Sequence, residues 1–262
     1  MIGIPGVMLY FLCNHKKGLK TMKNNDVKEY YSGVVSGRYN SDYEKKRWSE
    51  NSILKADFEM TRRSIKHALL NHSFDSCLEV GPGPGTWTKV LYDNNPKATY
   101  QLIDISEAMK DEFLKSFDKK TENITYDLSD FIVYNFTKEY DFFFSSRALE
   151  YFDNKQKFVD KVFLALSDGG CGCIISKNPM YSASKKEIRD FHAGQISATE
   201  LKKILTSQGF KSVTCRPAII RLPIISRWFG GLSNFLHMIS MKLPLQIFPK
   251  RIIESYIITF KK

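Results

Sequence analysis

Short apolar runs and longer amphipathic segments alternate through the middle of the chain. Five runs rich in β-branched and aromatic residues predict buried strands, and helix-like apolar spacing lies between most of them. The strands are predicted at Ser76–Val80, Thr99–Ile103, Asn123–Tyr126, Asp141–Ser145 and Cys171–Ser176, and the helices at Thr86–Asn94, Glu107–Phe117 and Gln156–Leu166. Strands that alternate with helices at this distance indicate βαβ units and a mainly parallel sheet covered on both faces.

Further elements are predicted on both sides of this region. Apolar residues at near-helical spacing indicate a helix over Asn51–Leu70. Another helix should begin at the capping box Ser197–Glu200 and end at Gly209, because glycine is a common helix stop. Two final strands are expected at Ser212–Thr214 and Ser255–Phe260. The prediction is an α/β fold: a doubly wound, mostly parallel seven-stranded sheet with a helical insertion before the last strand.

The length of 262 residues suits one α/β domain with additions, or two small domains. Residues 1–23 are predicted to be a disordered tail or a misassigned start, with Met22 opening the protein. Their apolar stretch is too short to span a bilayer, and its lysines follow it, whereas a signal peptide would place them before it. A weak membrane-surface anchor is the alternative. The rest is predicted to be one domain over 24–262, divided into an N-terminal cap (24–72), a ligand-binding core (73–215), a lid insertion (216–254) and a last strand (255–262).

A glycine-rich turn, CLEVGPGPGTWT at residues 77–88, follows the first predicted strand. In a doubly wound sheet such a turn faces the ligand. The dinucleotide fingerprint GxGxxG, counted from Gly81, requires a third glycine where the chain has Thr86, and the residues around Lys89 do not match a phosphate loop. Glu79, just before the turn, would repel a pyrophosphate but suits an ammonium or sulfonium group. The turn therefore indicates a nucleoside with a cationic tail and no phosphate.

A second acid stands at the end of the next predicted strand. Asp104, in TYQLIDIS, follows Gly85 by nineteen residues. At the carboxyl end of a strand beside the glycine turn, a carboxylate can accept two hydrogen bonds from a ribose diol. The alternative is that Asp104 caps the helix that follows.

The order Glu-x-Gly-x-Gly-x-Gly after a strand, with an acid at the end of the next strand, resembles the class I, Rossmann-like S-adenosylmethionine-dependent methyltransferases, especially their small-molecule "type 11" group. The resemblance covers about residues 74–210 and implies S-adenosylmethionine as the cofactor. It implies cofactor contacts from Glu79, Gly81, Gly83 and Gly85 at the methionine part, Asp104 at the ribose, Ile105 against the adenine, Asp130 near the adenine amino group, Phe131 beside the ring and Ser146 beside the methionine amino group.

The loop after the fourth predicted strand, FFFSSRALEYF, departs from that family. Arg147 and Tyr151 stand where relatives often carry histidines, so no catalytic role is carried over to this loop. The candidate general base is His192, in RDFHAGQIS, a segment that faces the acceptor in relatives, because a hydroxyl or acidic carbon acceptor is helped by a base. The alternatives for His192 are a helix-cap partner and a substrate-orienting donor. Arg147 and Tyr181 are secondary candidates for binding an acidic or polar acceptor.

Cysteine content and charge limit the kinds of partner. The five cysteines form no CxxC pair and the five histidines are scattered, so we expect no disulfide framework and no protein-bound metal. The net charge of +11 is uneven, since residues 216–262 hold eight basic residues against one acid, Glu254. The apolar residues among them are mostly aliphatic. This composition suits a lid over a lipid-like acceptor or a peripheral membrane contact better than a nucleic-acid surface. A helical lid that buries its own apolar face against the domain is the alternative.

The predicted function is S-adenosylmethionine-dependent methyl transfer to a small-molecule or lipid-like acceptor. The protein is expected in the cytoplasm, with peripheral contact on the inner membrane face left open, and without a nucleic-acid or obligate protein partner. One alternative is an RNA or protein methyltransferase, which the basic charge permits. The other is a non-catalytic S-adenosylmethionine-binding regulator or subunit.

Overall fold

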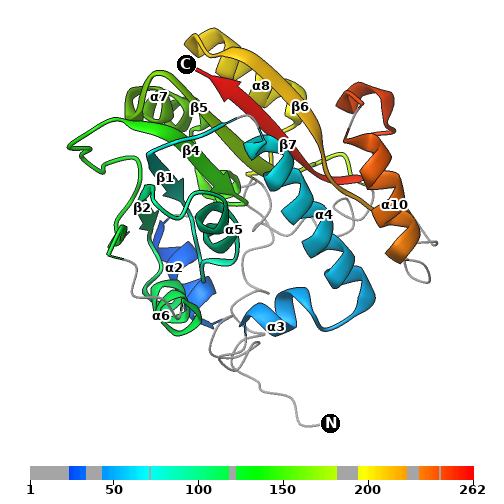
Figure 1. The fold of residues 1–262 in the computed structure, drawn as a ribbon, viewed down its shortest axis with the longest axis horizontal. Coiled ribbons are helices and arrows are strands. Elements are labelled where there is room, and N and C mark those ends of the chain that lie inside the picture. The colour runs from blue at the N-terminus through cyan, green and yellow to red at the C-terminus, as the bar shows by residue number, and fades with distance from the viewer. Residues whose placement is uncertain are drawn as a thin grey trace, which may run out of the picture.

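A seven-stranded sheet forms the centre of the part of the chain that the structure describes (Figure 1). The structure is a computed structural model, and it describes residues 24–33, 43–70, 72–117, 122–181, 194–222, 230–241 and 243–262. The strands are β1 Ser76–Val80, β2 Thr99–Asp104, β3 Ile124–Leu128, β4 Tyr140–Ser146, β5 Leu166–Lys177, β6 Lys211–Ile220 and β7 Ile253–Lys261, in the spatial order β3-β2-β1-β4-β5-β7-β6. The predicted α/β sheet is confirmed.

The strand directions bring the ends of several strands to one edge of the sheet. β1 pairs in parallel with both β2 and β4, β2 with β3, and β4 with β5. Only β7, inserted between β5 and β6, runs antiparallel to its neighbours within this sheet. The chain order reverses between β1 and β4, and this switch point is where open α/β sheets bind ligands at the carboxyl ends of their strands.

The described helices begin and end largely at local sequence signals. They are α2 Asn24–Gly33, α3 Tyr43–Trp48, α4 Ser52–Leu69, α5 Thr86–Asn94, α6 Glu107–Ser116, α7 Lys155–Ala165, α8 Ala198–Gln208 and α10 Gly230–Ser240, with short 3₁₀ turns η2 Leu149–Tyr151 and η4 Leu245–Ile247. Ser106 and Ser197 each cap a helix by accepting a backbone N–H three residues later. Gly209 ends α8 in the left-handed conformation that glycine adopts without strain.

Two apolar cores lie on opposite faces of the sheet. In β1, Leu78 and Val80 belong to the core formed with α7 and α8, whereas Cys77 belongs to the core formed with α4, α5 and α6. β4 alternates in the same way, with Phe143 in the first core and its two neighbours in the second. This burial on both faces explains why the strands lack the polar alternation of a half-exposed sheet.

The last two strands are longer than predicted. β6 runs on to Ile220, so the insertion occupies residues 221–252 and not 216–254. Arg216 and Pro217 interrupt the apolar run, but β6 lies at the edge of the sheet, where a strand tolerates proline. Residues 1–23 lie outside the described part of the chain. No described helix is long and apolar enough to cross a bilayer.

Candidate functional site

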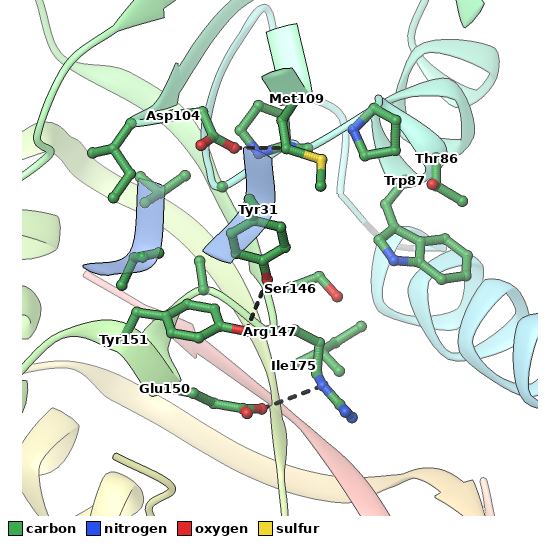
Figure 2. Close-up of a pocket in the computed structure, with 18 of the residues that line it drawn as sticks. Tyr31, Thr86, Trp87, Asp104, Met109, Ser146, Arg147, Glu150, Tyr151 and Ile175 are labelled. Carbon is green, nitrogen blue, oxygen red and sulfur yellow. Dashed lines mark hydrogen bonds and ion pairs between the residues drawn. The ribbon is translucent and has the colours of Figure 1, made fainter. Parts of the chain in front are cut away.

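A cavity of about 280 Å³ opens at the carboxyl ends of β1, β2 and β4, at the switch point of the sheet (Figure 2). Its wall combines the loops that follow these strands with residues from α2 and α3 in the N-terminal cap. Of the predicted cofactor residues, the wall includes Gly81, Gly83, Asp104, Ile105, Asp130, Phe131 and Ser146. Glu79 and Gly85 do not line the cavity.

The glycine turn adopts the conformation that its glycines permit. Gly81, Gly83 and Gly85 have φ values of 71°, 56° and 84°. A Cβ on Gly81 would lie 2.4 Å from the Cβ of Ala148, so this glycine allows the loop after β4 to close against the turn. A Cβ on Gly85 would lie 2.6 Å from the ring of Phe113, so this glycine allows α6 to pack. Gly85 is therefore a packing residue.

Asp104 ends β2 with its carboxylate in the cavity wall. One carboxylate oxygen accepts a hydrogen bond from the backbone N–H of Gly83 at 3.1 Å, and the other accepts one from Ser106 at 2.9 Å. These bonds orient the carboxylate, which lies in the cavity wall where the hydroxyls of a ligand can reach it. Burial raises the pKa of Asp104, and these backbone donors partly offset that rise. The alternative that Asp104 caps the following helix is wrong, because the Ser106 hydroxyl caps α6.

Glu79 lies behind the glycine turn and not at its mouth. Glu79 is only 1% exposed, and its carboxylate accepts a hydrogen bond from the Thr88 hydroxyl at 2.8 Å. Burial, together with the nearby charge of Asp104, outweighs that bond and raises the pKa of Glu79 to about 8. A cation bound in front of the turn would favour the charged carboxylate.

Three predicted residues lie in the wall next to the loops after β3 and β4. The Ser146 hydroxyl is buried, and within the described residues it has no hydrogen-bond partner (Figure 2). Asp130 is oriented by a bond from the backbone N–H of Ile132 at 2.9 Å. Phe131 packs its ring 5.2 Å from that of Phe158, so it joins the cavity wall to the core. An unpartnered buried hydroxyl in a cavity wall is a group that a polar ligand can satisfy.

Aromatic residues from the cap and from the core meet in another part of the wall. The Tyr31 and Tyr151 hydroxyls share a hydrogen bond at 2.8 Å between α2 and the loop after β4 (Figure 2). Trp48 of α3 lies 5.1 Å from Trp87 of α5, measured between ring centroids, and the guanidinium of Arg47 lies over Trp48. Sequence reasoning did not assign these residues to the site; the signals were the richness of the cap in tyrosine and the position of Trp87 beside the glycine turn.

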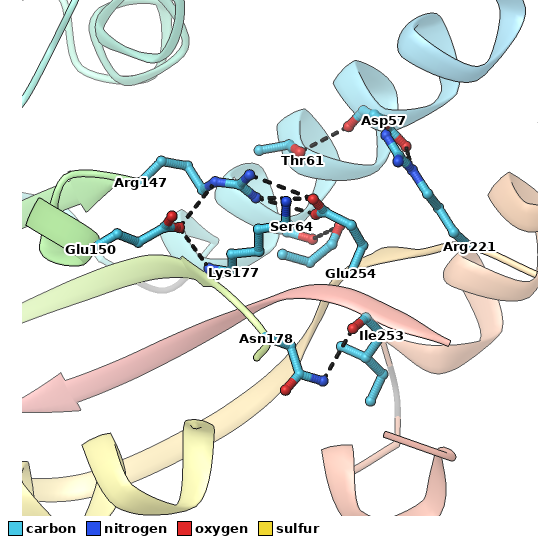
Figure 3. A network of polar contacts seen from close by, with 11 residues as sticks. Asp57, Thr61, Ser64, Arg147, Glu150, Lys177, Asn178, Arg221, Ile253 and Glu254 are labelled. Carbon is cyan, nitrogen blue, oxygen red and sulfur yellow. Dashed lines mark hydrogen bonds and ion pairs between the residues drawn. The ribbon is translucent and has the colours of Figure 1, made fainter. Parts of the chain in front are cut away.

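A buried ionic network supports one side of the cavity (Figure 3). Arg147, a wall residue with a φ of 65°, contacts Glu150 at 3.2 Å and Glu254 of β7 at 3.2 Å. Arg221, at the start of the insertion, pairs with Asp57 of α4. Burial alone would raise the pKa of Glu254, but the charges of Arg147 and Arg221 outweigh it and lower this pKa to about 2. The charge of Arg147 is therefore already balanced within the protein.

The remaining candidates do not reach the cavity in the described residues. Tyr181 is buried near Arg221 and does not line the cavity. His192 lies outside the described residues. The described chain resumes at Gly194, where a Cβ would meet the backbone oxygen of Glu150 at 1.8 Å. Among the described residues no group of His, Cys, Asp and Glu is placed to hold a metal ion.

Comparison with known proteins agrees with this geometry. Residues 77–170, which run from β1 to β5, match a family model described as a methyltransferase domain. The chain carries a methyltransferase domain of the class I fold. The predicted fold and the predicted class I S-adenosylmethionine-dependent methyltransferase family are thereby confirmed, whereas the "type 11" group stays a prediction. The match falls inside the predicted core of 73–215.

Similar proteins share parts of this chain or its fold. Malonyl-[acyl-carrier protein] O-methyltransferase 1 of Ilyobacter polytropus is 30% identical over 93 residues, which are 36% of this chain and 34% of that protein. The match thus spans about a third of the length of this curated relative. The N-methyltransferase NodS from Bradyrhizobium japonicum, in complex with S-adenosylhomocysteine, has a TM-score of 0.59 at 12% identity, covering 90% of this chain and 97% of that one. Phosphoethanolamine N-methyltransferase 2 of Haemonchus contortus, with S-adenosylmethionine, has a TM-score of 0.61 at 14% identity, covering 89% of this chain and 60% of that one.

Proposed function

We propose that this protein transfers the methyl group of S-adenosylmethionine to a small-molecule or lipid-like acceptor. The observation that carries the proposal is the cavity at the switch point, where the glycine turn, the Asp104 carboxylate and the unpartnered Ser146 hydroxyl meet. The turn matches neither the dinucleotide fingerprint nor the phosphate loop, which supports a ligand without a phosphate.

The donors and acceptors of the wall fit the parts of this cofactor. Asp104 is the acceptor for the two ribose hydroxyls, and Ile105 and Phe131 offer apolar surface for the adenine, with Asp130 as the acceptor for its amino group. Gly81 and Gly83 keep side chains away from the methionine part, where Ser146 supplies a hydroxyl. Bound there, S-adenosylmethionine supplies a methyl group that its sulfonium already activates.

The protein's own work is to align the acceptor and to exclude water. The aromatic residues Tyr31 and Trp48 of the cap and Trp87 of α5 line the cavity and offer apolar surface that would exclude water once the ligands are bound. His192 remains our proposed general base for a hydroxyl or acidic carbon acceptor. If it acts in this way, His192→Ala lowers kcat and leaves cofactor affinity unchanged.

The lining of the cavity indicates the class of acceptor better than the similar proteins do. The similar proteins are named for different acceptors, and one fold hosts many acceptors. The cavity wall beyond the proposed cofactor residues includes Val27, Trp48, Ile175 and Ile219, which favour an apolar acceptor. We place the protein in the cytoplasm, with peripheral membrane contact as part of this proposal.

Binding tests the cofactor half of the proposal. Calorimetry with purified protein should show S-adenosylmethionine and S-adenosylhomocysteine binding and no binding of NADH. Asp104→Asn should weaken both by about 10- to 100-fold, because a lost charge-assisted hydrogen bond costs about 1.5–3 kcal/mol. Asp93→Asn, on the exposed side of α5, is the matched control and should bind like the wild type. NADH binding without S-adenosylmethionine binding would overturn the proposal.

Transfer of labelled methyl tests the acceptor half. Incubating the enzyme with labelled cofactor and separated lipid, metabolite, RNA and protein fractions should place the label in lipids or metabolites. Label in RNA or protein would overturn the acceptor class. Cofactor binding with no label in any fraction would support the non-catalytic alternative instead.

A further inference from the structure

Helix α10 presents its apolar side chains to the outside. Its buried residues Ser233, His237 and Ser240 are polar, whereas Phe235 and Met238 are 57% and 52% exposed. A surface helix ordinarily turns its apolar stripe towards the core, so the polarity of α10 is inverted. Figure 1 shows α10 at the edge of the molecule beside α4, and the helix packs on α4 and β6.

Polar contacts fix this orientation. The Ser64 hydroxyl of α4 lies 3.1 Å from Nε2 of His237, and the Arg63 guanidinium donates to the side-chain oxygen of Asn234 at 2.8 Å. Arg63 also lies 3.3 Å from Nδ1 of His237. Rotating the helix to bury its apolar side would break these contacts with Arg63 and Ser64 and press apolar side chains against polar groups of α4, which is costly. The exposed apolar side is therefore a property built into the fold.

The segment that carries α10 is cationic. Residues 221–252 contain five Lys and Arg residues and no Asp or Glu. Lys250 and Arg251 are exposed and follow η4, whose Ile247 is 59% exposed. Exposed apolar side chains beside exposed positive charge complement a partner that is apolar inside and anionic at its surface, which describes a bilayer with acidic headgroups.

We propose that this surface docks on an anionic lipid bilayer. The surface, called the α10 face below, consists of Leu232, Phe235, Met238, Ile239, Ile247, Lys250 and Arg251. Eleven helical residues are too few to span the bilayer, so α10 lies in the plane of the headgroups. A second copy of this chain is a poorer occupant, because two such faces would bring like charges together with no acidic residue between them.

The position of the insertion relates the α10 face to the cavity. The insertion leaves β6 and returns to β7, and its ends are joined by the bond from Arg221 N to Ile252 O at 2.8 Å. Ile219 and Ser255, a few residues inside these strands, line the cavity. If the proposed methyl transfer holds, docking brings this wall of the cavity beside the bilayer, from which a lipid-like acceptor can enter.

Vesicle co-sedimentation of the full chain tests the docking independently of methyl transfer. The wild type should pellet at low salt with vesicles of phosphatidylcholine mixed with phosphatidylglycerol, and much less with phosphatidylcholine alone or at high salt. Lys250→Ala with Arg251→Ala should lower partitioning about 30-fold, which corresponds to about 1 kcal/mol for each lost contact. Phe235→Ser with Met238→Ser should lower it at least about tenfold.

Matched controls test whether binding depends on the α10 face or on any exposed charge or apolar side chain of the protein. Lys202→Ala with Lys203→Ala removes two exposed charges from α8, and Leu164→Ser removes a side chain that is 70% exposed on α7; both should partition like the wild type. Melting curves and cofactor affinity should be unchanged in every variant. The proposal is overturned if the wild type stays in the supernatant at low salt, as it would if another segment of the chain covered the face. It is also overturned if the α10 variants pellet like the wild type, or if the wild type is a dimer that Phe235→Ser dissociates.

Discussion

Asp104 and Glu79 both carry a carboxyl group, but their positions in the site allow different roles. Asp104 ends its strand, so its carboxylate reaches past the sheet into the cavity wall and is oriented by backbone donors from Gly83 and Ser106. Glu79 lies one residue before the end of β1, and its side chain turns under the glycine loop to Thr88. The first can contact a ligand directly, whereas the second can act on a ligand through its charge.

The protonation of Glu79 predicts a pH dependence of stability. Its pKa is about 8 in the folded protein against an ordinary value of 4.5, so the folded state holds a proton that the unfolded state loses. The contribution is fully present below pH 4.5 and is lost as the pH rises from 4.5 to 8. The free energy of unfolding should fall in this window by up to about 1.4 kcal/mol per pH unit. Urea unfolding at several pH values checks this, and Glu79→Gln should remove that part of the slope. Equal slopes in both proteins would contradict the prediction.

At the scale of elements, the contact between α10 and α4 depends on a neutral histidine. Burial and the charge of Arg63 lower the pKa of His237 to about 4, against an ordinary value of 6.5. The contribution to stability is therefore present above pH 6.5 and is lost as the pH falls from 6.5 to 4. Amide hydrogen exchange in α10 should accelerate in this window before exchange in β1 or β4 does. His237→Gln, which keeps a partner for Ser64, should make the protection of α10 less sensitive to pH, and an unchanged profile would argue against a role for this histidine.

Elements were predicted well where their signals are local. β1 and α5 match the predicted bounds because the glycine turn between them fixes where the strand stops and the helix starts. β6 was predicted too short because Pro217 is disfavoured in most strands, and only its place at the sheet edge makes it acceptable. The inverted polarity of α10 was not predicted, since it depends on the polar partners that α4 supplies from far away in the chain.

For the molecule as a whole, the sequence predicted the part of the site formed by the loops after the strands better than the part formed by the N-terminal cap. The loops after β1, β2, β3 and β4 meet because parallel strands end at one edge, so predicting the strands brought Asp104, Asp130 and Ser146 together. The cap residues could not be placed in this way, because α2 and α3 reach the cavity through side-chain packing between segments distant in sequence. Trp48 on Trp87 and Tyr31 on Tyr151 are such contacts.

These contacts join the cap to the core across the cavity, so ligand binding should stabilise both together. S-adenosylhomocysteine at 100 times its Kd should raise Tm by roughly 5–10 °C, which follows from a binding contribution of about 2.7 kcal/mol. It should also slow protease cleavage within α2 and α3, because Tyr31 and Trp48 line the filled cavity. Tyr31→Phe, which removes the bond to Tyr151, should lose part of this protection, whereas Tyr92→Phe on α5 should keep it. A rise in Tm without slower cleavage of the cap would mean that the ligand is held by the core alone.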